Sequence, residues 1–416
     1  MSRNRDLNGI VVGIDIGTSK VACAVAEISS IDSSPRVIGF GLCPSHGLKK
    51  GVVVNIESTV YAIQQVVKDA ENMANTQVSL VCAGITGGHV RGMNSHGMVA
   101  IKDREVQRGD IDRVIETARA VLIPADQDVL HILTQEFTVD GQSGVKDPLG
   151  MSGVRLEVNV HIVSGAISAA QNIIKCVRRC NLEIEDLVVQ PFASSQSTLT
   201  SDEKDLGVCL IDIGAGTTDL MVFVGGAVRY TSVIPIAGSQ VTSDIAIALH
   251  TPMKDAEAIK CQYGCALCEL VSDDEQISVP SIGDRADKCF SAAVLAGVIQ
   301  PRLEELFELI RDELIYHGFE DVLSSGIVIT GGTAEMTGIE VLAERIFRIP
   351  VRIGRPRYIG PLSDKVCSPS LSTLYGLLIE ARDQCYMEQS DPKKTAIFAP
   401  ILGFFSGIQT WFKENF

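Results

Sequence analysis

The stretch GIDIGTSK, residues 13–20, has a near copy in the stretch IDIGAGTTD, residues 211–219. Each stretch closes an apolar run with an aspartate, Asp15 or Asp212, and continues with glycine and hydroxyl residues. The apolar run predicts a buried strand, and the glycine predicts a tight turn after it. Because the same turn occurs twice at a large separation, we expect two halves with the same topology.

Turns of this composition favour phosphate binding. Their backbone amides and hydroxyls can donate hydrogen bonds to phosphate oxygens, and glycine lets the backbone come close to an anion. One such turn is common in ordinary hairpins, whereas two copies can face each other across a cleft and hold one triphosphate. The residues predicted to do so are Gly17, Thr18, Ser19 and Lys20 in the first copy and Gly214, Ala215, Gly216, Thr217 and Thr218 in the second.

The two aspartates predict a magnesium ion between the protein and the phosphates. A carboxylate repels a polyphosphate unless a divalent cation lies between them, and Mg²⁺ prefers oxygen ligands while keeping several waters. We therefore expect Asp15 and Asp212 to hold Mg²⁺ directly or through water. Lys20 adds a compact positive charge beside the first turn.

A third glycine-rich turn, in the stretch VITGGTAEM, predicts a site for a nucleobase. Gly331 and Gly332 would let a flat adenine ring lie against the backbone, and Thr333 can hydrogen-bond to it. The alternative is a turn that only begins a helix.

A charged pair in the stretch DAEAIK predicts contacts to the ribose and the edge of the base. Glu257 and Lys260 are three residues apart, so they share one face of a helix. The alternative is a solvated ion pair on the helix surface.

Charge and composition exclude several classes of protein. A chain of 416 residues predicts two lobes, and 46% hydrophobic with 21% charged residues is typical of a folded globular protein. A net charge of −15 argues against nucleic acid as a partner, because binding to phosphate backbones needs clustered lysine and arginine. The apolar runs are shorter than the roughly 20 residues of a spanning helix, so we do not expect an integral membrane protein.

The 12 cysteines follow no disulfide spacing, and the first residues lack the pattern of a cleaved signal peptide. We therefore expect a reducing, cytoplasmic environment. Cys261, Cys265 and Cys268 fall on a predicted helical stretch and could share one face. Buried free thiols are favoured there over a metal site or a redox role, because no second ligand pair with metal spacing follows.

The three glycine-rich elements, in this order, resemble the nucleotide signature of the superfamily of actin, sugar kinases and heat-shock ATPases. Within it, the chain is similar to FtsA, a family of actin-like bacterial cell division proteins. The resemblance covers nearly the whole chain and is carried by GVVVNIESTVYAI, LTSDEKDLGVCLIDIGAGTTD, VIPIAGSQVTSDIA, TPMKDAEAIKCQYGCAL, VRIGRP and the terminus rich in Phe and Trp. It implies an α/β fold of two actin-like, ribonuclease-H-like lobes that bind ATP, and it adds Gly238 to the nucleotide-binding residues.

The resemblance also implies a division of the chain. The first lobe core would take up 1–83 and 164–195, with an inserted subdomain at 84–163 on a different side from its counterpart in actin. The second lobe core would take up 196–227 and 305–368, with an outer subdomain at 228–304. The remaining parts would be a closing helix at 369–385, a linker at 386–396 and an amphipathic helix at 397–416.

By the same resemblance, we expect a role at the division septum. Members of this family would form ATP-dependent head-to-tail filaments on the cytoplasmic face of the inner membrane and tether FtsZ filaments there by binding the C-terminal peptide of FtsZ. That peptide would lie on the outer subdomain, and later division proteins on the inserted one. Arg302 and Glu305 fall on the helix expected to contact the partner; the alternative for each is a solvated helix face.

Two positions depart from related ATPases. Glu335 stands where heat-shock ATPases place an arginine over adenine, so stacking from this position is not expected. In VVQPFASS, on the helix expected to link the lobes, Gln190 is the one side chain that could position an attacking water. Because an amide is not a useful base at neutral pH, we expect slow ATP hydrolysis at most.

The last twenty residues predict a membrane contact. Ile401, Phe404, Phe405, Ile408, Trp411 and Phe412 follow helical spacing and form one apolar stripe. Gly403 and Gly407 each cost about 1 kcal/mol in a helix, so the segment should fold only against a surface that buries the stripe. We expect that surface to be the membrane interface, and the alternative is the protein's own core.

Two other functions share parts of this pattern. A sugar or acetate kinase of the same superfamily would need an acidic base in the cleft and has no use for the aromatic terminus. An FtsA-like assembly protein of pilus systems would share the core but would not need that terminus.

Overall fold

The computed structural model describes residues 9–31, 33–272, 274–283 and 286–390. The amphipathic helix predicted at 397–416 and its six stripe residues lie outside this part of the chain, as do residues 391–396 of the expected linker.

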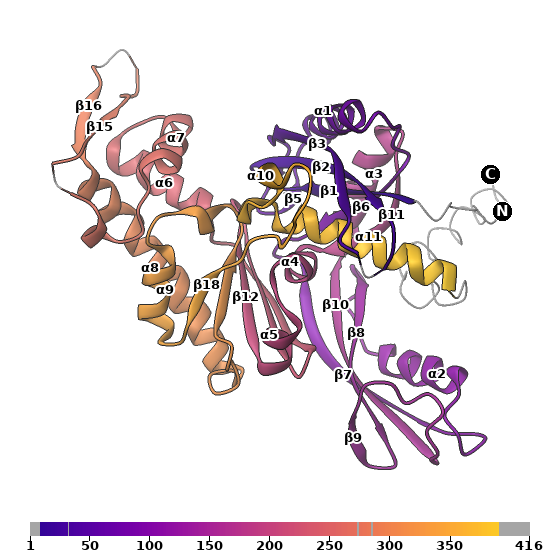
Figure 1. The fold of residues 1–416 in the computed structure, drawn as a ribbon. Helices are drawn as coiled ribbons and strands as arrows, with labels where there is room; N and C mark the ends of the chain where they lie inside the picture. Colours follow the sequence, from indigo (N-terminus) through magenta and orange to yellow (C-terminus); the bar gives the residue numbers. More distant parts are fainter. Residues whose placement is uncertain (1–8, 32, 273, 284–285, 391–416) are drawn as a thin grey trace.

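A five-stranded sheet forms the centre of the first lobe (Figure 1). In spatial order its strands are β11 (Glu183–Val189), β6 (Leu80–Ile85), β1 (Gly9–Ile16), β2 (Lys20–Ile28) and β3 (Arg36–Pro44). Strands β1 and β2 form the hairpin predicted around the first turn, and β6 runs parallel to β1.

The second lobe contains a sheet of the same design. In spatial order its strands are β14 (Ala227–Ile234), β13 (Thr218–Val224), β12 (Val208–Ile213), β17 (Ile327–Thr330) and β18 (Val351–Ile353). The hairpin of β12 and β13 corresponds to that of β1 and β2, and β17 runs parallel to β12 as β6 does to β1. The predicted internal repeat is therefore confirmed.

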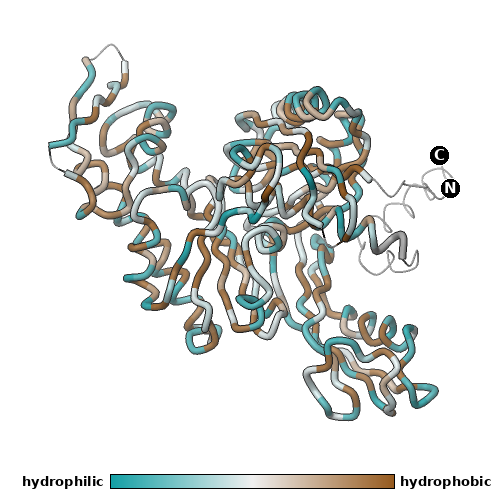
Figure 2. Tube along the Cα trace, in the orientation of Figure 1, coloured by the Kyte–Doolittle hydropathy of each residue, from teal (hydrophilic) through white to brown (hydrophobic). Residues whose placement is uncertain are grey.

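Helices cover both faces of the first sheet. On one face, α1 (Ile56–Ala74) and α3 (Ile167–Arg179) pack on alternate residues of the strands, including Ile14 and Val25. On the other face lie α4 (Gln190–Thr198) and α11 (Ser372–Ser390), which cross closely between the lobes. Because helices cover both faces of the sheet, side chains on both sides of its strands are apolar, and the strands are continuous apolar runs in the sequence. Figure 2 shows such apolar strands at the centre of both lobes.

An insertion between β6 and α3 folds around its own core. Its sheet has the order β7 (Arg91–Ala100), β10 (Arg155–Ala166), β8 (Gln127–Val139) and β9 (Gln142–Val145), and α2 (Arg108–Arg119) packs on it. Buried side chains such as Val114, Leu156 and Ile162 hold the helix to the sheet. In Figure 1 this unit and the hairpin of β15 (Gln276–Val279) and β16 (Lys288–Ser291) lie at opposite ends of the molecule.

The outer part of the second lobe is mostly helical. Its elements are α6 (Gly238–Leu249), α7 (Met253–Tyr263), the 3₁₀ turn η1 (Cys268–Leu270) and α8 (Ala292–Tyr316), and beyond β17 come η2 (Gly332–Glu335) and α9 (Ile339–Phe347). Shorter elements elsewhere are β4 (Leu48–Lys49), β5 (Val52–Val53), α5 (Ser201–Leu206), α10 (Ser363–Val366) and η3 (Pro369–Leu371). No helix in the described residues is both long and apolar enough to cross a bilayer.

Helix α8 begins at Ala292 and runs through Pro301, because Leu295 and Ile299 are buried and hold the preceding turns in place. Helix α11 continues to Ser390, so the first residues of the linker expected at 386–396 are helical. No proline or glycine interrupts the chain between Ala381 and that end, which explains the extension.

The cysteine cluster was also misinterpreted. Helix α7 ends at Tyr263, and Gly264 has an extended conformation, so the three cysteines do not share a helix. Cys265 is buried, as expected, whereas Cys261 and Cys268 are exposed.

Close packing of α1 on β3 yields a first prediction. A side chain at Gly41 would overlap the carbonyl oxygen of Val66 and place its Cβ 2.8 Å from the carbonyl carbon of Val66, and backbone cannot move aside easily. We expect Gly41→Ala to destabilise the fold by about 1–3 kcal/mol, as overpacking does. Thermal unfolding followed by circular dichroism measures the loss.

The matched control is Gly297→Ala, on the exposed face of α8, where an added Cβ would have no described atom within 4 Å other than its chain neighbours and the nearby backbone of its own helix. This change should leave the unfolding temperature unchanged or raise it. Equal effects of the two substitutions would contradict the packing argument.

Candidate functional site

A cavity of about 360 Å³ lies where the two lobes meet. Its wall includes most of the residues that the sequence assigns to a nucleotide and its metal ion. These are Asp15, Gly17, Thr18, Ser19, Lys20, Gln190, Asp212, Gly214, Ala215, Gly216, Thr217, Glu257, Lys260, Gly331, Gly332 and Thr333. Residues from five separate parts of the chain are thus brought together in one place.

Two of the expected residues lie behind this wall. Thr218 is fully buried and donates from its hydroxyl to the carbonyl oxygen of Ile236, at 2.7 Å. Gly238 donates its N–H to the carbonyl oxygen of Gly214, at 3.1 Å, and accepts a hydrogen bond from Lys260 Nζ. Both support the cavity from outside rather than lining it.

The two repeated turns are closed by the same hydrogen bond. Gly17 donates its N–H to the carbonyl oxygen of Lys20 at 2.9 Å, and Gly214 donates its N–H to that of Thr217 at 3.0 Å. Each turn directly follows a buried strand that ends near an aspartate. The similarity seen in the sequence is therefore a similarity of backbone geometry.

The turns also approach each other across the lobes. A Cβ added to Gly216 would lie 2.5 Å from Thr18 Oγ1, which is closer than real Cβ atoms come to any neighbour. Only glycine therefore fits at this position, and the backbones of both turns face the same cavity.

Three carboxyl groups are buried at this meeting point. Asp15 Oδ1 accepts a hydrogen bond from Gln190 Nε2 at 3.0 Å. Asp212 Oδ2 accepts from Ser194 Oγ on α4, at 2.5 Å. Asp219 is the third of these buried carboxyl groups.

Asp219 Oδ1 accepts a hydrogen bond from Thr86 Oγ1 at 2.5 Å. No role was predicted for this residue, although it ends the stretch IDIGAGTTD. It lies directly opposite Asp212 in the β12–β13 hairpin, so the two side chains share one face of the sheet. In the first lobe the corresponding position opposite Asp15 is Ala22. The pairing of Asp219 with Asp212 in the hairpin, and not the sequence motif itself, could have identified Asp219 as a residue of the site.

Burial makes the ionised forms of these carboxyl groups unfavourable. It raises the pKa of Asp15 to about 6, against the opposing charge of Lys20 and with a small addition from Asp212. It raises the pKa of Asp219 to about 8, and repulsion from Asp212 adds to this rise. Burial likewise lowers the pKa of the Lys20 ammonium group, although the nearby carboxylates oppose the shift.

These carboxyl groups fit a divalent cation shared with phosphate. A cation would favour the ionised form of all three carboxyls, and Mg²⁺ takes carboxylate oxygens readily. Among the described residues, no group of three or more His, Cys, Asp and Glu side chains is arranged to hold a metal by itself. An ion here would therefore need waters or phosphate oxygens as further ligands, as Mg²⁺ commonly has.

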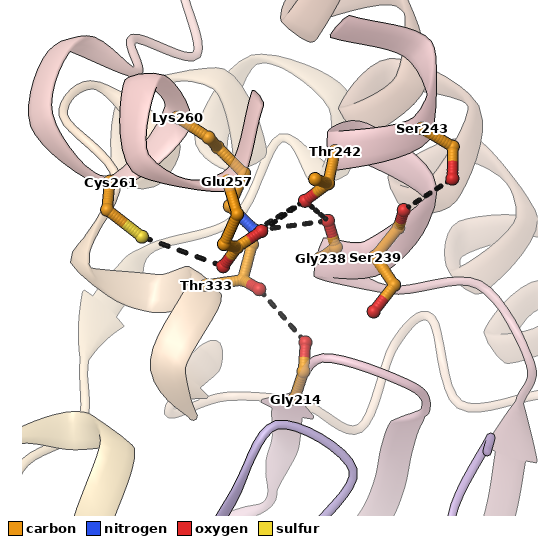
Figure 3. Close-up of polar contacts among 9 residues, drawn as sticks. All are labelled: Gly214, Gly238, Ser239, Thr242, Ser243, Glu257, Lys260, Cys261 and Thr333. Carbon is orange, nitrogen blue, oxygen red and sulfur yellow. Dashed lines mark hydrogen bonds and ion pairs between the residues drawn. The ribbon is translucent and has the colours of Figure 1, made fainter. Parts of the chain in front are cut away.

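The opposite end of the cavity is a charged and hydroxylated network between α6 and α7 (Figure 3). Lys260 Nζ lies 2.7 Å from Glu257 Oε2 and donates to Thr242 Oγ1 at 3.0 Å. Burial alone would raise the pKa of Glu257, but the charge of Lys260 and hydrogen bonds from Lys260, Thr242 and Cys261 together outweigh burial, and the pKa ends below its ordinary value. Glu257 and Lys260 thus form the ion pair that the sequence left as an alternative, yet both also line the cavity.

Thr333 belongs to the same end. Its hydroxyl donates to the carbonyl oxygen of Gly214 at 3.0 Å, which ties the third glycine-rich turn to the second (Figure 3). Glu335 also lines the cavity and accepts a hydrogen bond from Ser368 Oγ, so its carboxylate is held at the wall.

Several other residues of the wall were not predicted to bind a ligand. They are Gly51, Thr86, Cys261, Gln262, Gly264, Met336, Thr337, Pro369, Ser370 and Thr373. Lys20 Nζ donates to the carbonyl oxygen of Ser370, and Thr373 Oγ1 donates to Asp212 Oδ2 at 3.3 Å. The first contact brings η3 to the first lobe's turn, and the second joins the start of α11 to the second lobe. No local pattern could have revealed pairings so distant in sequence.

Arg302 and Glu305 lie outside the cavity, on α8. Arg302 makes two hydrogen bonds to the carboxylate of Asp244 on α6, at 2.6 and 3.2 Å, and a third to Glu305. Both side chains therefore take part in an ion-pair network on the outer part of the second lobe.

Comparison with known proteins gives close relatives over the full length. The chain is 54% identical to the cell division protein FtsA of Pseudomonas aeruginosa, over 98% of each chain. It is 41% identical to FtsA of Escherichia coli K12, again over 98% of each. The chain belongs to the FtsA family of cell division proteins.

Family models agree with this membership. The model described as cell division protein FtsA matches residues 209–376, which include the second repeated turn and the third glycine-rich turn. The model described as an SHS2 domain inserted in FtsA matches residues 87–164, nearly the range of the expected insertion at 84–163.

Solved structures of more distant proteins share the fold. One is a PilM–PilN type IV pilus biogenesis complex, with a TM-score of 0.64, 17% identity and coverage of 89% of this chain and 98% of that one. Another is MreB5 of Spiroplasma citri bound to ADP, with a TM-score of 0.56, 15% identity and coverage of 92% and 99%. These likenesses confirm the predicted actin-like α/β fold for this FtsA family member.

The buried position of Asp219 predicts a pH dependence of stability. Its pKa of about 8 in the folded protein exceeds the ordinary value of 3.8, so the folded state holds the proton that the unfolded state releases between these values. Stability without ligands should therefore fall as pH rises from about 4 to 8. Asp219→Asn removes this contribution and should reduce the fall in melting temperature between pH 5 and pH 8 by at least about 2 °C.

The measurement is thermal unfolding in EDTA without nucleotide, so that no cation stabilises the carboxylates. Asp321→Asn, a change at an exposed aspartate, serves as the control and should leave the wild-type fall intact. A wild-type fall that persists in full in Asp219→Asn would contradict the assignment.

Proposed function

We propose that the protein binds ATP with Mg²⁺ in the cavity between its lobes, assembles into filaments on the cytoplasmic face of the inner membrane and tethers FtsZ filaments there at the division septum. Membership in the FtsA family supports the setting in cell division. The observation that carries nucleotide binding is the pair of identically bonded turns that meet at one cavity. A distant structural neighbour, MreB5, was solved bound to ADP.

In this proposal the two turns hold the phosphates from opposite sides. Backbone amides and the hydroxyls of Thr18, Ser19 and Thr217 are the donors, and Lys20 supplies a positive charge. The carboxylates of Asp15 and Asp212 would hold Mg²⁺, directly or through water. That ion would offset the charge of the phosphates when bound.

The base and ribose would occupy the other end. Glu257 and Lys260 offer an acceptor and a donor for ribose hydroxyls and the base edge. Gly331 and Gly332 present backbone without side chains for a flat ring to lie against, and Thr333 stands beside them.

Hydrolysis would be slow. The amide NH₂ group of Gln190 donates a hydrogen bond to Asp15. The side-chain carbonyl oxygen of Gln190 is left to orient a water molecule, but an amide oxygen cannot take a proton from that water. Asp219 adds a carboxyl group that the sequence interpretation lacked, yet with a pKa of about 8 it keeps its proton at neutral pH in the ligand-free cavity. Its ability to act as a base would depend on a bound cation. In this proposal the protein acts mainly as a nucleotide-dependent switch, and its ATP turnover is of secondary importance.

Membrane attachment would come from the stripe of Ile401, Phe404, Phe405, Ile408, Trp411 and Phe412, which the sequence places on one helical face. A single short amphipathic segment binds a membrane weakly. If ATP favours filaments, many such segments act together on one surface, and their effective concentration lengthens residence.

Partners would attach at both ends of the molecule. The outer part of the second lobe, with Arg302 and Glu305, is the proposed site for the FtsZ C-terminal peptide. The ion-pair network of Arg302 with Asp244 offers charge of both signs there, and a purely solvated surface is the alternative. The inserted subdomain would bind later division proteins.

A substitution at Gly216 tests nucleotide binding directly. A Cβ there would lie 2.5 Å from Thr18 Oγ1 and 2.9 Å from Lys50 Cα, so a larger side chain must push the turns apart. We expect Gly216→Val to weaken ATP binding by at least about tenfold, measured by isothermal titration calorimetry with Mg²⁺.

Gly88→Val is the matched control, since no described atom other than those of its chain neighbours lies within 4 Å of a Cβ at this position. It should leave ATP affinity unchanged. An unchanged affinity in Gly216→Val, with the protein still folded, would refute the cavity as the ATP site.

Removal of residues 397–416 tests the membrane anchor. The truncated protein should keep its ATP affinity but no longer float with liposomes of anionic lipid. In the full chain, Trp411→Glu should reduce flotation strongly because it places a charge on the stripe, whereas Thr410→Glu, off the stripe, should reduce it less. Undiminished flotation after truncation would show that the anchor lies elsewhere.

A further inference from the structure

Two side chains of α4 hold the two carboxyl groups that were predicted to bind Mg²⁺. Gln190 Nε2 donates a hydrogen bond to Asp15 Oδ1 at 3.0 Å, and Ser194 Oγ donates one to Asp212 Oδ2 at 2.5 Å. Residues four apart in an α-helix lie on the same face, about one turn from each other. One face of α4 therefore holds a carboxyl group from each lobe.

A second hydroxyl group supports Ser194. Thr373, on α11, places its Oγ1 2.9 Å from Ser194 Oγ and 3.3 Å from Asp212 Oδ2. A hydroxyl carries one proton, and since that of Ser194 goes to the carboxylate, the Ser194 oxygen can accept the proton of Thr373. Asp212 Oδ2 is thus held from two helices, α4 and α11.

Backbone closes the other side of the Asp212 carboxyl group. A Cβ added to Gly331 would lie 2.5 Å from Asp212 Oδ1 and 2.5 Å from the carbonyl oxygen of Ile213. The main chain at Gly331 therefore packs against Oδ1 while the hydroxyls hold Oδ2. The carboxyl group has little room to turn as long as both hydroxyls are in place.

Ser194 acts on the cavity from behind its wall. Its side chain is fully buried, and it is not one of the described residues that line the cavity. Asp212, by contrast, is a lining residue. An effect of Ser194 on a bound ligand must therefore pass through its hydrogen-bond partners or through the packing of α4.

We propose that Ser194 is a positioning residue for Mg²⁺, through which one face of α4 sets the placement of Asp212 relative to Asp15. This inference rests on the nucleotide site proposed above and specifies how that site is matched to its metal ion. Mg²⁺ demands near-ideal octahedral geometry, whereas Ca²⁺ accepts flexible arrangements of oxygen ligands. A fixed carboxyl group therefore favours Mg²⁺, and a carboxyl group released from Ser194 loses part of that preference.

The experiment measures the affinity of the full chain for ATP with Mg²⁺ and with Ca²⁺, by calorimetry, in wild type and in Ser194→Ala. The substitution removes a hydrogen bond to a charged group and adds no bulk. We expect the affinity with Mg²⁺ to fall about fivefold or more, and the affinity with Ca²⁺ to change by less than about twofold. A defect of packing alone would weaken both complexes to the same extent.

Thr373→Val provides an independent variant, because valine has nearly the size of threonine and lacks its hydroxyl. The bond from Thr373 to Asp212 is the longer of the two, so the ratio of the Mg²⁺ and Ca²⁺ affinities should shift in the same direction but less, by about threefold. If Ser194→Ala fails to fold, this variant carries the test.

The matched control is Ser195→Ala, at the next position of the same helix. Ser195 is fully buried, and its hydroxyl donates to the carbonyl oxygen of Phe192 at 2.7 Å. This substitution removes a buried hydroxyl from α4 without removing a bond to a carboxyl group. It should preserve the ratio of the two affinities even where it lowers the melting temperature.

Each outcome decides between the two proposals. If the folded wild type binds ATP with neither ion, the proposed function itself fails. If wild type binds ATP with both ions and Ser194→Ala weakens both complexes equally, or neither, the nucleotide site stands and the positioning role is overturned. If wild type binds ATP with Mg²⁺ only, the role is overturned when Ser194→Ala and Ser195→Ala lose affinity equally. A ratio changed as much by Ser195→Ala would also overturn it, because disturbance of α4 would then explain the effect.

Discussion

One backbone hydrogen bond that closes a turn, made once in each lobe, sets the geometry on which the site depends. It joins Gly17 N–H to the carbonyl of Lys20 and Gly214 N–H to that of Thr217, and each bond closes a turn after a buried strand. These turns fix the registers of their hairpins and meet where Gly216 leaves no room for a side chain. Two sheets of equal topology are thereby held with their equivalent edges facing one cavity.

That arrangement concentrates charge where water is excluded. Carboxyl groups from both lobes are buried together, and burial raises the pKa of Asp15 to about 6 and that of Asp219 to about 8, so that Asp219 keeps its proton at neutral pH while Asp15 is mostly ionised there. Buried carboxylates without a cation are energetically unfavourable. A ligand that brings a cation therefore stabilises the closed arrangement of the two lobes by mass action. In this account the electrostatic cost of the empty site couples nucleotide binding to the relative placement of the lobes.

The sequence predicted the elements that follow local rules and missed those that depend on tertiary contacts. Both repeated turns and the strands before them were predictable, because apolar runs and glycine act over a few residues. The helix through Pro301 was not fully predictable, since buried side chains on the preceding turns override the proline. Asp219 needed the hairpin register, and Ser370 reaches Lys20 from a distant part of the chain that carries no matching pattern.

The central claim is that one nucleotide lies between the two turns, and a crystal structure of the full chain with Mg²⁺ and a non-hydrolysable ATP analogue tests it most directly. The account predicts density for the phosphates within hydrogen-bond distance of the turns at Gly17 and Gly216, and a metal ion beside Asp15 and Asp212. Nucleotide density at any other place, or contact with only one of the two turns, would contradict it.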